Sequence, residues 1–235
     1  MKVLFLDIDG VIQLHTQRRF DHSKEEIYAL CRNLTKKFHG VFDYSAWVGD
    51  SEGNPFWTVA AVQWDWNPET IKELGRVLGT TGAKIVLSSS WRDNGNEAMK
   101  ALFRIWGLGS YYLDSTLPEY FWDSRDNASR TLSKRYRELM NPERFVNPRS
   151  FEILEWLDRH PEVTSYAIID DIYDIVGHGD HFVCSSRGLK KNEADKLIAA
   201  LQIKDGPYSL PEEIRSMPEL EIVRGDKPLE DEGGI

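Results

Sequence analysis

Short apolar runs that end in polar residues recur along the chain and predict strands. Each run has four or five residues, and together they occupy residues 2–6, 83–87, 166–169 and 181–184. Runs of this length, bounded by polar residues and separated by helical patterns, are typical of buried strands in a parallel sheet. The pattern therefore predicts an α/β fold, with a three-layer, Rossmann-like arrangement in which helices cover both faces of the sheet.

Helix starts between these runs are marked by the dipeptide Asn-Pro, at 67–68 and again at 147–148. Asparagine is a good N-cap, and proline is well suited to the first helical position. Apolar residues then follow at helical spacing after each dipeptide: Ile71, Leu74, Val77 and Leu78 after the first, and Phe151, Leu154 and Leu157 after the second. Residues 189–201 have the pattern of a last amphipathic helix.

Two insertions interrupt the alternation of strands and helices. The first, 15–66, contains a capping-box pair, Ser23 and Glu26, ahead of an amphipathic helix. Its second half, 41–66, is aromatic and punctuated by Gly and Asp, which favours a hairpin or flap. The second insertion spans 107–146. We therefore expect one domain over 1–205, with a small flap or cap after the first strand.

The charge of the chain is concentrated at its C-terminal end. The 235 residues carry a net charge of −9, which argues against a general nucleic-acid binder, because such binding relies on Lys and Arg. Residues 206–235 hold eight acids and three bases, so the domain itself carries only −4. We interpret 206–235 as an acidic tail, and the domain is close to neutral outside its candidate site.

Cysteine content and hydropathy indicate the compartment. Cys31 and Cys184 are too few for a disulfide framework or a zinc site, which favours a reducing cytoplasm. The apolar start of the chain is interrupted by Asp7 and Asp9, unlike a signal peptide, and no apolar stretch approaches the ~20 residues that span a bilayer. We expect a cytoplasmic protein with no membrane partner and no obligate protein partner.

Carboxylates follow two of the predicted strands. Asp7 and Asp9 come after the first, two residues apart, and Asp170 and Asp171 end the third; Ser88 ends the second. In open α/β sheets, ligands bind beyond the carboxyl ends of the strands. Converging carboxylates repel one another unless a hard cation binds them, and Mg²⁺ is the usual cation where a substrate supplies phosphate oxygens. The pattern predicts a Mg²⁺ site for phosphoryl chemistry.

These residues, in this order, resemble the four motifs of the haloacid dehalogenase-like (HAD) phosphohydrolase superfamily. The sequence around the second and fourth motifs looks like that of HAD domains associated with RNA-repair proteins. The two stretches that carry this resemblance are WNPETIKELGRVLGTTGAKIVLSSSWR and RSFEILEWLDRHPEVTSYAIIDD. Those domains are distantly similar to the phosphatase domain of phage polynucleotide kinase. The resemblance covers 1–14, 67–106 and 147–202, and it implies Mg²⁺-dependent hydrolysis of a phosphomonoester.

The resemblance also implies a role for each motif residue. Asp7 would be the nucleophile that forms an aspartyl-phosphate, and a ligand of Mg²⁺. Asp9 would be the general acid and base, with its backbone carbonyl on the metal. Ser88 would donate a hydrogen bond to a phosphoryl oxygen. Asp171 would bind the metal directly, with Asp170 beside it.

Two arginines complete the implied phosphate site. Arg149 has the position of the third-motif cation, in the first turn of the helix before the third strand, although the superfamily more often has Lys there. Lys190 and Lys191 are the weaker candidates for that role. Arg92, four residues after Ser88, would be a second phosphate contact.

The substrate is left open by the sequence. A nucleotide or nucleic-acid end is favoured by the resemblance and by a local excess of bases over 124–149. The aromatic residues of the first insertion fit either the core of a small cap or a base-stacking surface. The alternatives are a sugar phosphate or another metabolite, a phosphoprotein, and a non-catalytic HAD scaffold that binds nucleic acid or a partner. A metal site at His178 and His181 is a further, weaker hypothesis.

Overall fold

The structure is a computed structural model that describes residues 1–14, 16–45, 55–116, 148–173, 175, 178–185, 187–204, 206 and 208. Its centre is a five-stranded sheet with the order β3-β2-β1-β4-β5, in which every pair of neighbours is parallel. The strands are β1 (Lys2–Leu6), β2 (Lys84–Leu87), β3 (Tyr112–Ser115), β4 (Ser165–Asp170) and β5 (Phe182–Cys184). The predicted α/β class is confirmed.

One strand was not predicted. β3 is the edge strand beside β2, and it lies within the stretch assigned to the second insertion. Its sequence, YLDS, has only two apolar residues, and its burial is mixed. An edge strand is covered less completely than a central one, so it lacks the apolar run by which the others were found. The domain core therefore continues to at least Thr116, and the boundary at 107 was wrong.

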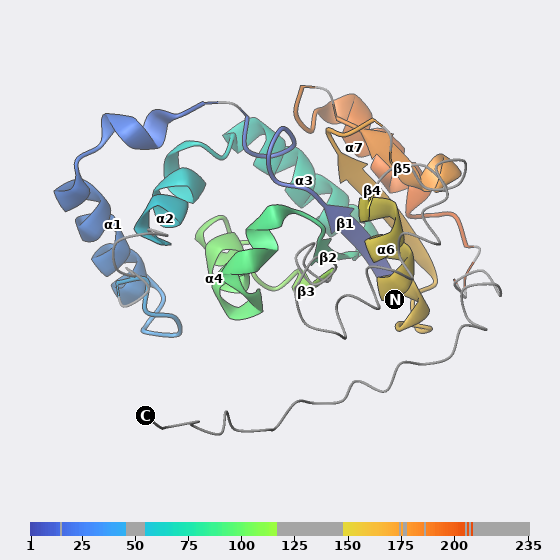
Figure 1. Ribbon diagram of the computed structural model, residues 1–235, viewed down its shortest axis with the longest axis horizontal. Coiled ribbons are helices and arrows are strands. Elements are labelled where there is room, and N and C mark those ends of the chain that lie inside the picture. Colours follow the sequence, from blue (N-terminus) through green and yellow to red (C-terminus); the bar gives the residue numbers. More distant parts are fainter. Residues whose placement is uncertain are drawn as a thin grey trace, which may run out of the picture.

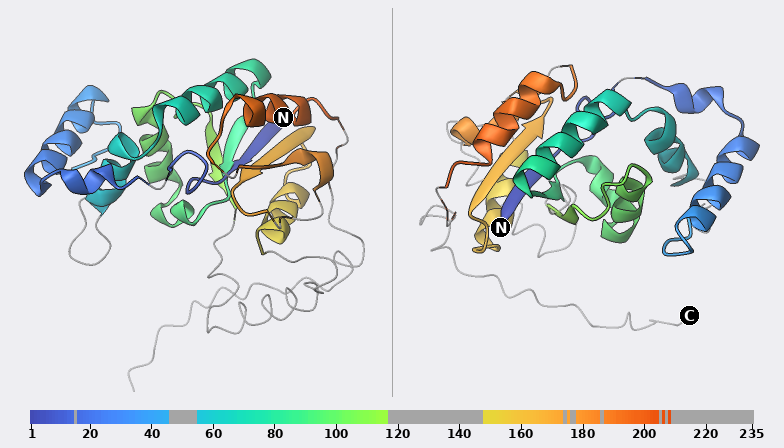
Figure 2. Two further views of the ribbon diagram at one scale, coloured as in Figure 1. Left: turned by 90° about the horizontal axis from the view of Figure 1, so that it is seen from above. Right: turned by 180° about the vertical axis from the view of Figure 1, so that it is seen from behind.

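Helices cover both faces of the sheet, as Figure 2 shows. α3 (Pro68–Thr81) and α7 (Lys191–Ala200) pack on one face, against side chains such as Leu4, Leu87 and Ile169. α6 (Pro148–Asp158) packs on the other, where Trp156 meets Phe5 edge to face. α4 (Asn96–Ile105) lies beside β3, and its buried side chains continue the hydrophobic cluster that α3 and α7 form with the sheet. This is the three-layer arrangement expected from the sequence.

The predicted caps are present where they are described. The side chain of Asn67 accepts hydrogen bonds from the backbone N–H groups of Glu69 and Thr70 at the start of α3. Ser23 and Glu26 form the reciprocal capping box at the start of α1 (Lys24–Lys37). These caps satisfy backbone donors that have no partner inside the helix.

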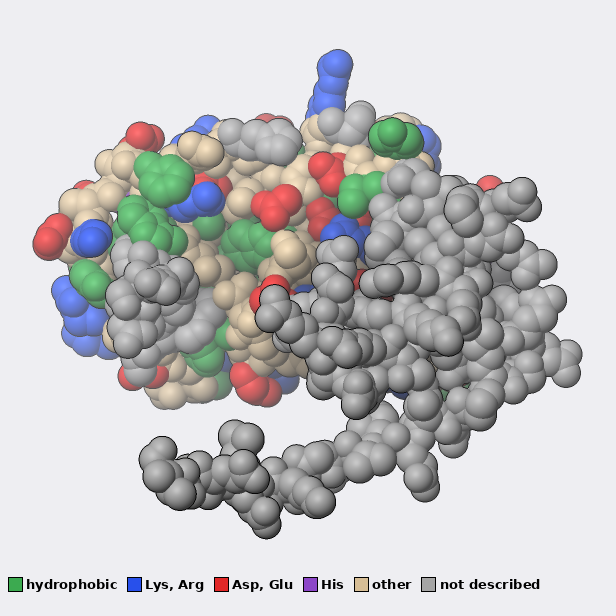
Figure 3. All heavy atoms as spheres, in the orientation of Figure 1, with side chains coloured by type: hydrophobic (Ala, Val, Ile, Leu, Met, Phe, Trp, Pro, Cys, Tyr) green, Lys and Arg blue, Asp and Glu red, His purple; other side chains and the backbone are tan. Residues whose placement is uncertain are grey.

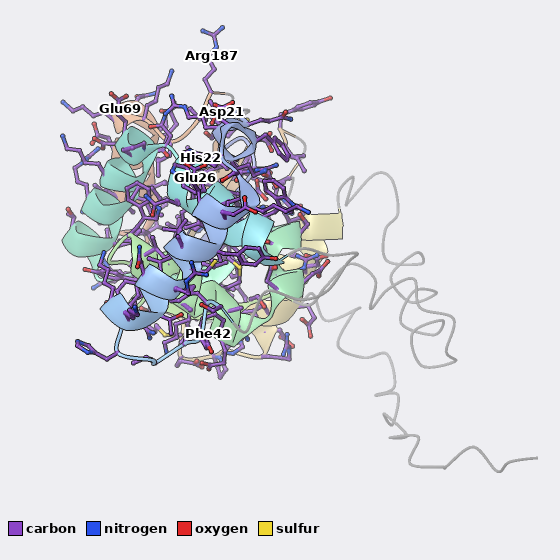
Figure 4. All side chains as sticks on the ribbon, turned by 90° about the vertical axis from the view of Figure 1, so that its left-hand side faces the viewer. Asp21, His22, Glu26, Phe42, Glu69 and Arg187 are labelled. Carbon is purple, nitrogen blue, oxygen red and sulfur yellow. The ribbon has the colours of Figure 1, made fainter. Side chains whose placement is uncertain are left out.

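The first insertion folds as a helical cap that lies beside the core, and we use "cap" for its described residues, 16–45 and 55–66. It contains η1 (Arg18–Asp21), α1 and α2 (Pro55–Trp64), which lie together at one end of the molecule (Figure 1). Figure 4 views this end from outside: Asp21, His22 and Glu26 lie close together where η1 leads into α1. The His22 ring stacks on Trp64 of α2 with centroids 3.7 Å apart, which joins the two halves of the cap.

The prediction of a hairpin over 41–66 was wrong, because its second half is the helix α2. The run FWTVAAVQW has β-branched and aromatic residues that favour strands in isolation. In the structure, Val59 and Val62 are instead buried between α1 and α4. The Asn54-Pro55 dipeptide in the sequence is the same start signal that was read correctly at 67–68.

The cap is held together at its base and is hydrogen-bonded to the core further out. At the base, Asp65 accepts hydrogen bonds from the backbone and the guanidinium of Arg19, at 3.0 and 2.5 Å, which link the two described segments of the cap. Further out, the indole of Trp106 in the core donates to the carbonyl of Val62 at 2.9 Å. The Tyr44 hydroxyl donates to the carbonyl of Ala101 in α4 at 2.6 Å.

Several sequence predictions lie outside the described residues. These are the basic stretch 124–149 up to residue 147 and the acidic tail beyond Tyr208. Among the described residues, no helix has the length and apolar character needed to cross a membrane.

Candidate active site

The strand order brings the predicted acidic residues to one edge of the sheet. β1 is central, with β2 on one side and β4 on the other, so the order reverses between β1 and β4. Loops diverge at such a point and leave a crevice at the carboxyl ends of the strands. Asp7 follows β1 and Asp170 ends β4, and the backbone N–H of Asp7 donates to the carbonyl of Ile169 at 3.1 Å.

Three carboxylates converge at this edge. Asp7, Asp170 and Asp171 each offer an oxygen, and these atoms lie within 4.8 Å of one another. Asp7 and Asp170 are buried, whereas Asp171 is exposed. Oxygen-only ligands of this kind suit a hard divalent cation, so the residues fit the Mg²⁺ that the sequence implied.

Gly10 makes this convergence sterically feasible. Its φ is +74°, and a Cβ placed on it would lie 2.2 Å from Oδ2 of Asp171. Any other residue would therefore displace the Asp171 carboxylate as well as strain the backbone. The tight turn after β1 and the position of the fourth-motif acid thus depend on the same glycine.

Arg149 bridges two of the three acids. It lies in the first turn of α6, and its Nη1 is 3.0 Å from Oδ1 of Asp7 and 2.5 Å from Oδ2 of Asp170. The structure thus brings the predicted third-motif cation to the acidic cluster. Lys190 and Lys191 are exposed where α7 begins.

One arginine does not balance the electrostatics of the cluster. Burial raises the pKa of Asp7 to about 7, the nearby Asp170 carboxylate acts in the same direction, and Arg149 acts against them. Burial also raises the pKa of Asp170, again opposed by Arg149. The ionised cluster therefore lacks positive charge, which a divalent cation would supply.

Ser88 lies at the same edge, after β2. It is fully buried, and its backbone N–H donates to the carbonyl of Leu6 at 3.0 Å. Its hydroxyl has no hydrogen-bond partner among the described residues. Because a buried hydroxyl without a partner is costly, this donor is suited to an oxygen supplied by a ligand.

Asp9 is turned away from the acidic cluster towards a cleft. Its Oδ1 accepts a hydrogen bond from Nε2 of Gln13 at 2.8 Å, and its Oδ2 accepts one from the indole of Trp91 at 3.1 Å. Both residues line the cleft together with Asp9 itself. Neither Gln13 nor Trp91 was singled out in the sequence.

The cleft has a volume of about 520 Å³ and lies between the cap and the core. The cap contributes Arg19, Phe20 and Trp57, and the core contributes Trp91 from η2 (Ser90–Asn94). On the face of the molecule drawn in Figure 3, hydrophobic side chains reach the surface in the middle, with Asp and Glu side chains near them. Pockets of about 300–1,000 Å³ accept small organic ligands.

Arg92, the predicted second phosphate contact, is bound to protein through two of its guanidinium nitrogens. It is buried, and its Nη1 and Nη2 lie 2.7 and 3.1 Å from the two oxygens of Glu152. Nη1 also donates to Thr116 at 2.9 Å. Arg92 therefore joins η2 to α6 in a buried ion pair, and the phosphate contact stays a prediction.

Glu152, which was not singled out in the sequence, connects this pair to the site. It lies one helical turn after Arg149, and burial raises its pKa to about 7, with Arg92 and then Arg149 acting in the opposite direction.

The two histidines considered for a metal lie in the core. His178 Nδ1 is 3.0 Å from the Tyr166 hydroxyl, and its Nε2 is 3.3 Å from the carbonyl of Ser150. His181 Nδ1 is 2.8 Å from the carbonyl of Tyr166. Burial lowers the pKa of His178 to about 4, which fits a neutral ring held in a hydrogen-bond network.

Comparison with known families gives one match. The family described as "HAD domain in Swiss Army Knife RNA repair proteins" matches residues 3–194. This span includes both insertions, which the motif resemblance had left out. No curated protein and no solved structure matches the chain significantly.

Proposed function

We propose, since the chain belongs to the family of HAD domains in Swiss Army Knife RNA repair proteins, that it hydrolyses phosphomonoesters through an aspartyl-phosphate on Asp7. The observation that carries this proposal is the acidic cluster bridged by Arg149. A nucleophilic carboxylate, two further carboxylates and a guanidinium within hydrogen-bond distance match the needs of phosphoryl transfer, which relies on positioning and charge neutralisation.

In the first step, a carboxylate oxygen of Asp7 attacks phosphorus, and the bond from phosphorus to the alcohol oxygen breaks. Asp9, acting as general acid, transfers its proton to the departing oxygen. Arg149 and the Ser88 hydroxyl contact the phosphoryl oxygens, and Arg149 also neutralises Asp7. The first product is the free alcohol.

In the second step, water attacks the phosphorus of the aspartyl-phosphate while Asp9 takes a proton from it. The acyl–phosphate bond breaks, inorganic phosphate leaves, and Asp7 and Asp9 return to their starting forms. One ester and one water thus give one alcohol and one phosphate. Mg²⁺ bound by Asp7, Asp170 and Asp171 would supply the positive charge that the cluster lacks and would hold the phosphoryl group in line.

The substrate that we propose is a nucleotide or a nucleic-acid end. The family description refers to RNA repair, and the cleft beside Asp9 has aromatic side chains on both walls. Phe20 and Trp57 pack against each other in the cap with centroids 5.1 Å apart, and Trp91 lies on the core side. Aromatic rings of this kind can stack on a nucleobase.

The aromatic residues of the first insertion serve different purposes. Trp66 is buried in the hydrophobic core, and Tyr44 is buried against α4. Trp57 is only partly buried and lines the cleft. The burial of Trp66 and Tyr44 supports the cap-core interpretation for those two residues, and we propose base stacking for Trp57 alone among these three.

Phosphate release in the presence of Mg²⁺ tests the activity. Asp7→Asn should abolish turnover, and EDTA should abolish the activity of the wild type by removing Mg²⁺. A suitable control is Asp195→Asn, which changes an exposed aspartate in α7 by the same chemistry. Retention of wild-type turnover by Asp7→Asn, with folding intact, would contradict the mechanism.

The substrate class is tested separately with a panel of 3′- and 5′-phosphorylated oligonucleotides, free nucleotides and sugar phosphates. We expect the highest kcat/KM on oligonucleotide ends. A preference for sugar phosphates would support the alternative metabolite phosphatase. Absence of phosphate release from every substrate, together with binding of oligonucleotides, would support the non-catalytic scaffold.

A further inference from the structure

The carboxyl group of Asp9 is held by two side chains that the catalytic motifs do not include. We propose that Gln13 and Trp91 are positioning residues, which fix the rotation of this carboxyl so that its proton faces the leaving group. The inference rests on the proposed phosphatase activity and adds how its general acid is aimed.

Gln13 approaches Asp9 from the same turn. The backbone N–H of Gly10 donates to the carbonyl of Gln13 at 2.8 Å, and that of Gln13 donates to the carbonyl of Ile8 at 2.9 Å. This turn brings the side chain of Gln13 back towards Asp9, where its Nε2 donates the hydrogen bond to Oδ1. Its own Oε1 is buried and has no hydrogen-bond partner among the described residues.

Trp91 approaches from the opposite wall of the cleft. Its ring packs against the buried Trp66 with centroids 5.8 Å apart, and its carbonyl accepts a hydrogen bond from Asn94. The next residue, Arg92, anchors η2 through its ion pair with Glu152. The indole N–H therefore reaches Asp9 from a segment that is fixed on both sides.

Two donors on two different oxygens determine the rotation of a carboxyl group. The indole N–H of Trp91 and the amide N–H of Gln13 are donors, so each oxygen of Asp9 accepts one hydrogen bond. Each oxygen has a second lone-pair position, and the proton of the acid must occupy one of these. Since Asp9, Gln13 and Trp91 together line the cleft, a carboxyl group fixed in this rotation can offer its proton to a leaving group bound there.

A role in aiming the acid differs from a role in packing. A leaving group of low pKa, such as 4-nitrophenolate, departs with little help from an acid, whereas an alkoxide requires its proton. Loss of orientation should therefore reduce hydrolysis of esters with poor leaving groups selectively. Loss of packing would reduce hydrolysis of all esters by a similar factor.

The test measures kcat/KM for a series of substituted phenyl phosphates and benzyl phosphate, because kcat/KM reports the steps up to cleavage of the ester bond. Trp91→Phe keeps an aromatic ring and removes the donor, and Gln13→Met keeps the length and removes the other donor. We expect each variant to lower kcat/KM for benzyl phosphate by about tenfold or more, and for 4-nitrophenyl phosphate by no more than about twofold. Plotted against leaving-group pKa, log kcat/KM should fall more steeply than in the wild type.

Trp106→Phe is the matched control, because it removes an indole N–H bond of 2.9 Å to the carbonyl of Val62 rather than to Asp9. It should leave the slope of the plot unchanged. Slopes equal to that of the wild type in both Trp91→Phe and Gln13→Met, with folding confirmed by circular dichroism, would overturn the inference. Lack of turnover by the wild type itself would instead refute the proposed activity.

Discussion

The buried ion pair of Arg92 and Glu152 allows the sequence and structural interpretations of Arg92 to be separated by experiment. The two side chains are 4% and 2% exposed and make two hydrogen bonds to each other. Removing one partner of such a pair leaves a buried charge without compensation, at a cost of about 3–5 kcal/mol. Nε of Arg92 has no partner among the described residues, which favours the lower end of this range. We expect Arg92→Met to destabilise the fold by about 3 kcal/mol.

This loss should depend on pH. Burial raises the pKa of Glu152 to about 7 even with Arg92 opposing it, so without Arg92 the pKa must rise further. A carboxyl group whose folded pKa lies above its unfolded value of 4.5 loses stability as pH rises between those two values. The penalty of Arg92→Met should therefore be largest near pH 8 and should decrease towards pH 5.5, where Glu152 is protonated.

Urea denaturation and thermal melting of four proteins measure the effect: wild type, Arg92→Met, Glu152→Leu and the double variant. A chain of this length loses about 2–4 °C of Tm per kcal/mol, so the single Arg92 variant should melt about 6–12 °C lower. The double variant should recover most of the stability, since an apolar pair can replace a buried ion pair. A stability loss below about 1 kcal/mol at pH 8, combined with a raised KM, would refute the structural role and restore the phosphate contact.

Three further predictions follow from single contacts. Gly10→Ala should weaken activation by Mg²⁺ and lower kcat by about tenfold or more, because the new methyl group displaces Asp171. A Mg²⁺ titration of activity measures this effect. A titration curve equal to that of the wild type would contradict the predicted clash. The contribution of His178 to stability should fall by up to about 3 kcal/mol as pH drops from 6.5 to 4, since the unfolded chain binds a proton there that the buried ring does not. The stability difference between wild type and His178→Gln, measured by denaturation at each pH, isolates this contribution from the opposite ones of Asp7 and Glu152. Asn67→Ala should cost about 1 kcal/mol of stability through loss of the α3 cap, with unchanged kcat as the control reading.

The elements that sequence predicted well are those whose signals are local. The central strands are continuous apolar runs, and the caps at Ser23 and Asn67 are fixed by side chains within three residues. The edge strand β3 has no such run, because its outer side is less covered. α2 was mistaken for a hairpin because its β-branched residues are stabilised by burial against α1 and α4, which no local pattern records.

The candidate site shows the same division. Asp7, Asp170 and Asp171 follow strands, and parallel strands present their carboxyl ends at one edge, so their convergence could be predicted. Glu152 is 60 residues from Arg92, and only the packing of α6 against η2 brings the two together. The resemblance and the position after Ser88 made Arg92 a candidate for binding phosphate, and its buried partner Glu152 could not be identified from spacing.

The attachments of the cap limit how a substrate reaches Asp9. Arg19 and Asp65 close the cap at its base, and Tyr44 and Trp106 tie its body to α4 and the core. A lid that opens on a hinge has to break its contacts with the core in every turnover, and such opening often limits product release. Here those contacts include the buried hydrogen bond from Tyr44 to Ala101, so entry and exit depend on the aperture of the cleft as it stands. We therefore expect turnover to depend on the size of the leaving group and only weakly on solvent viscosity.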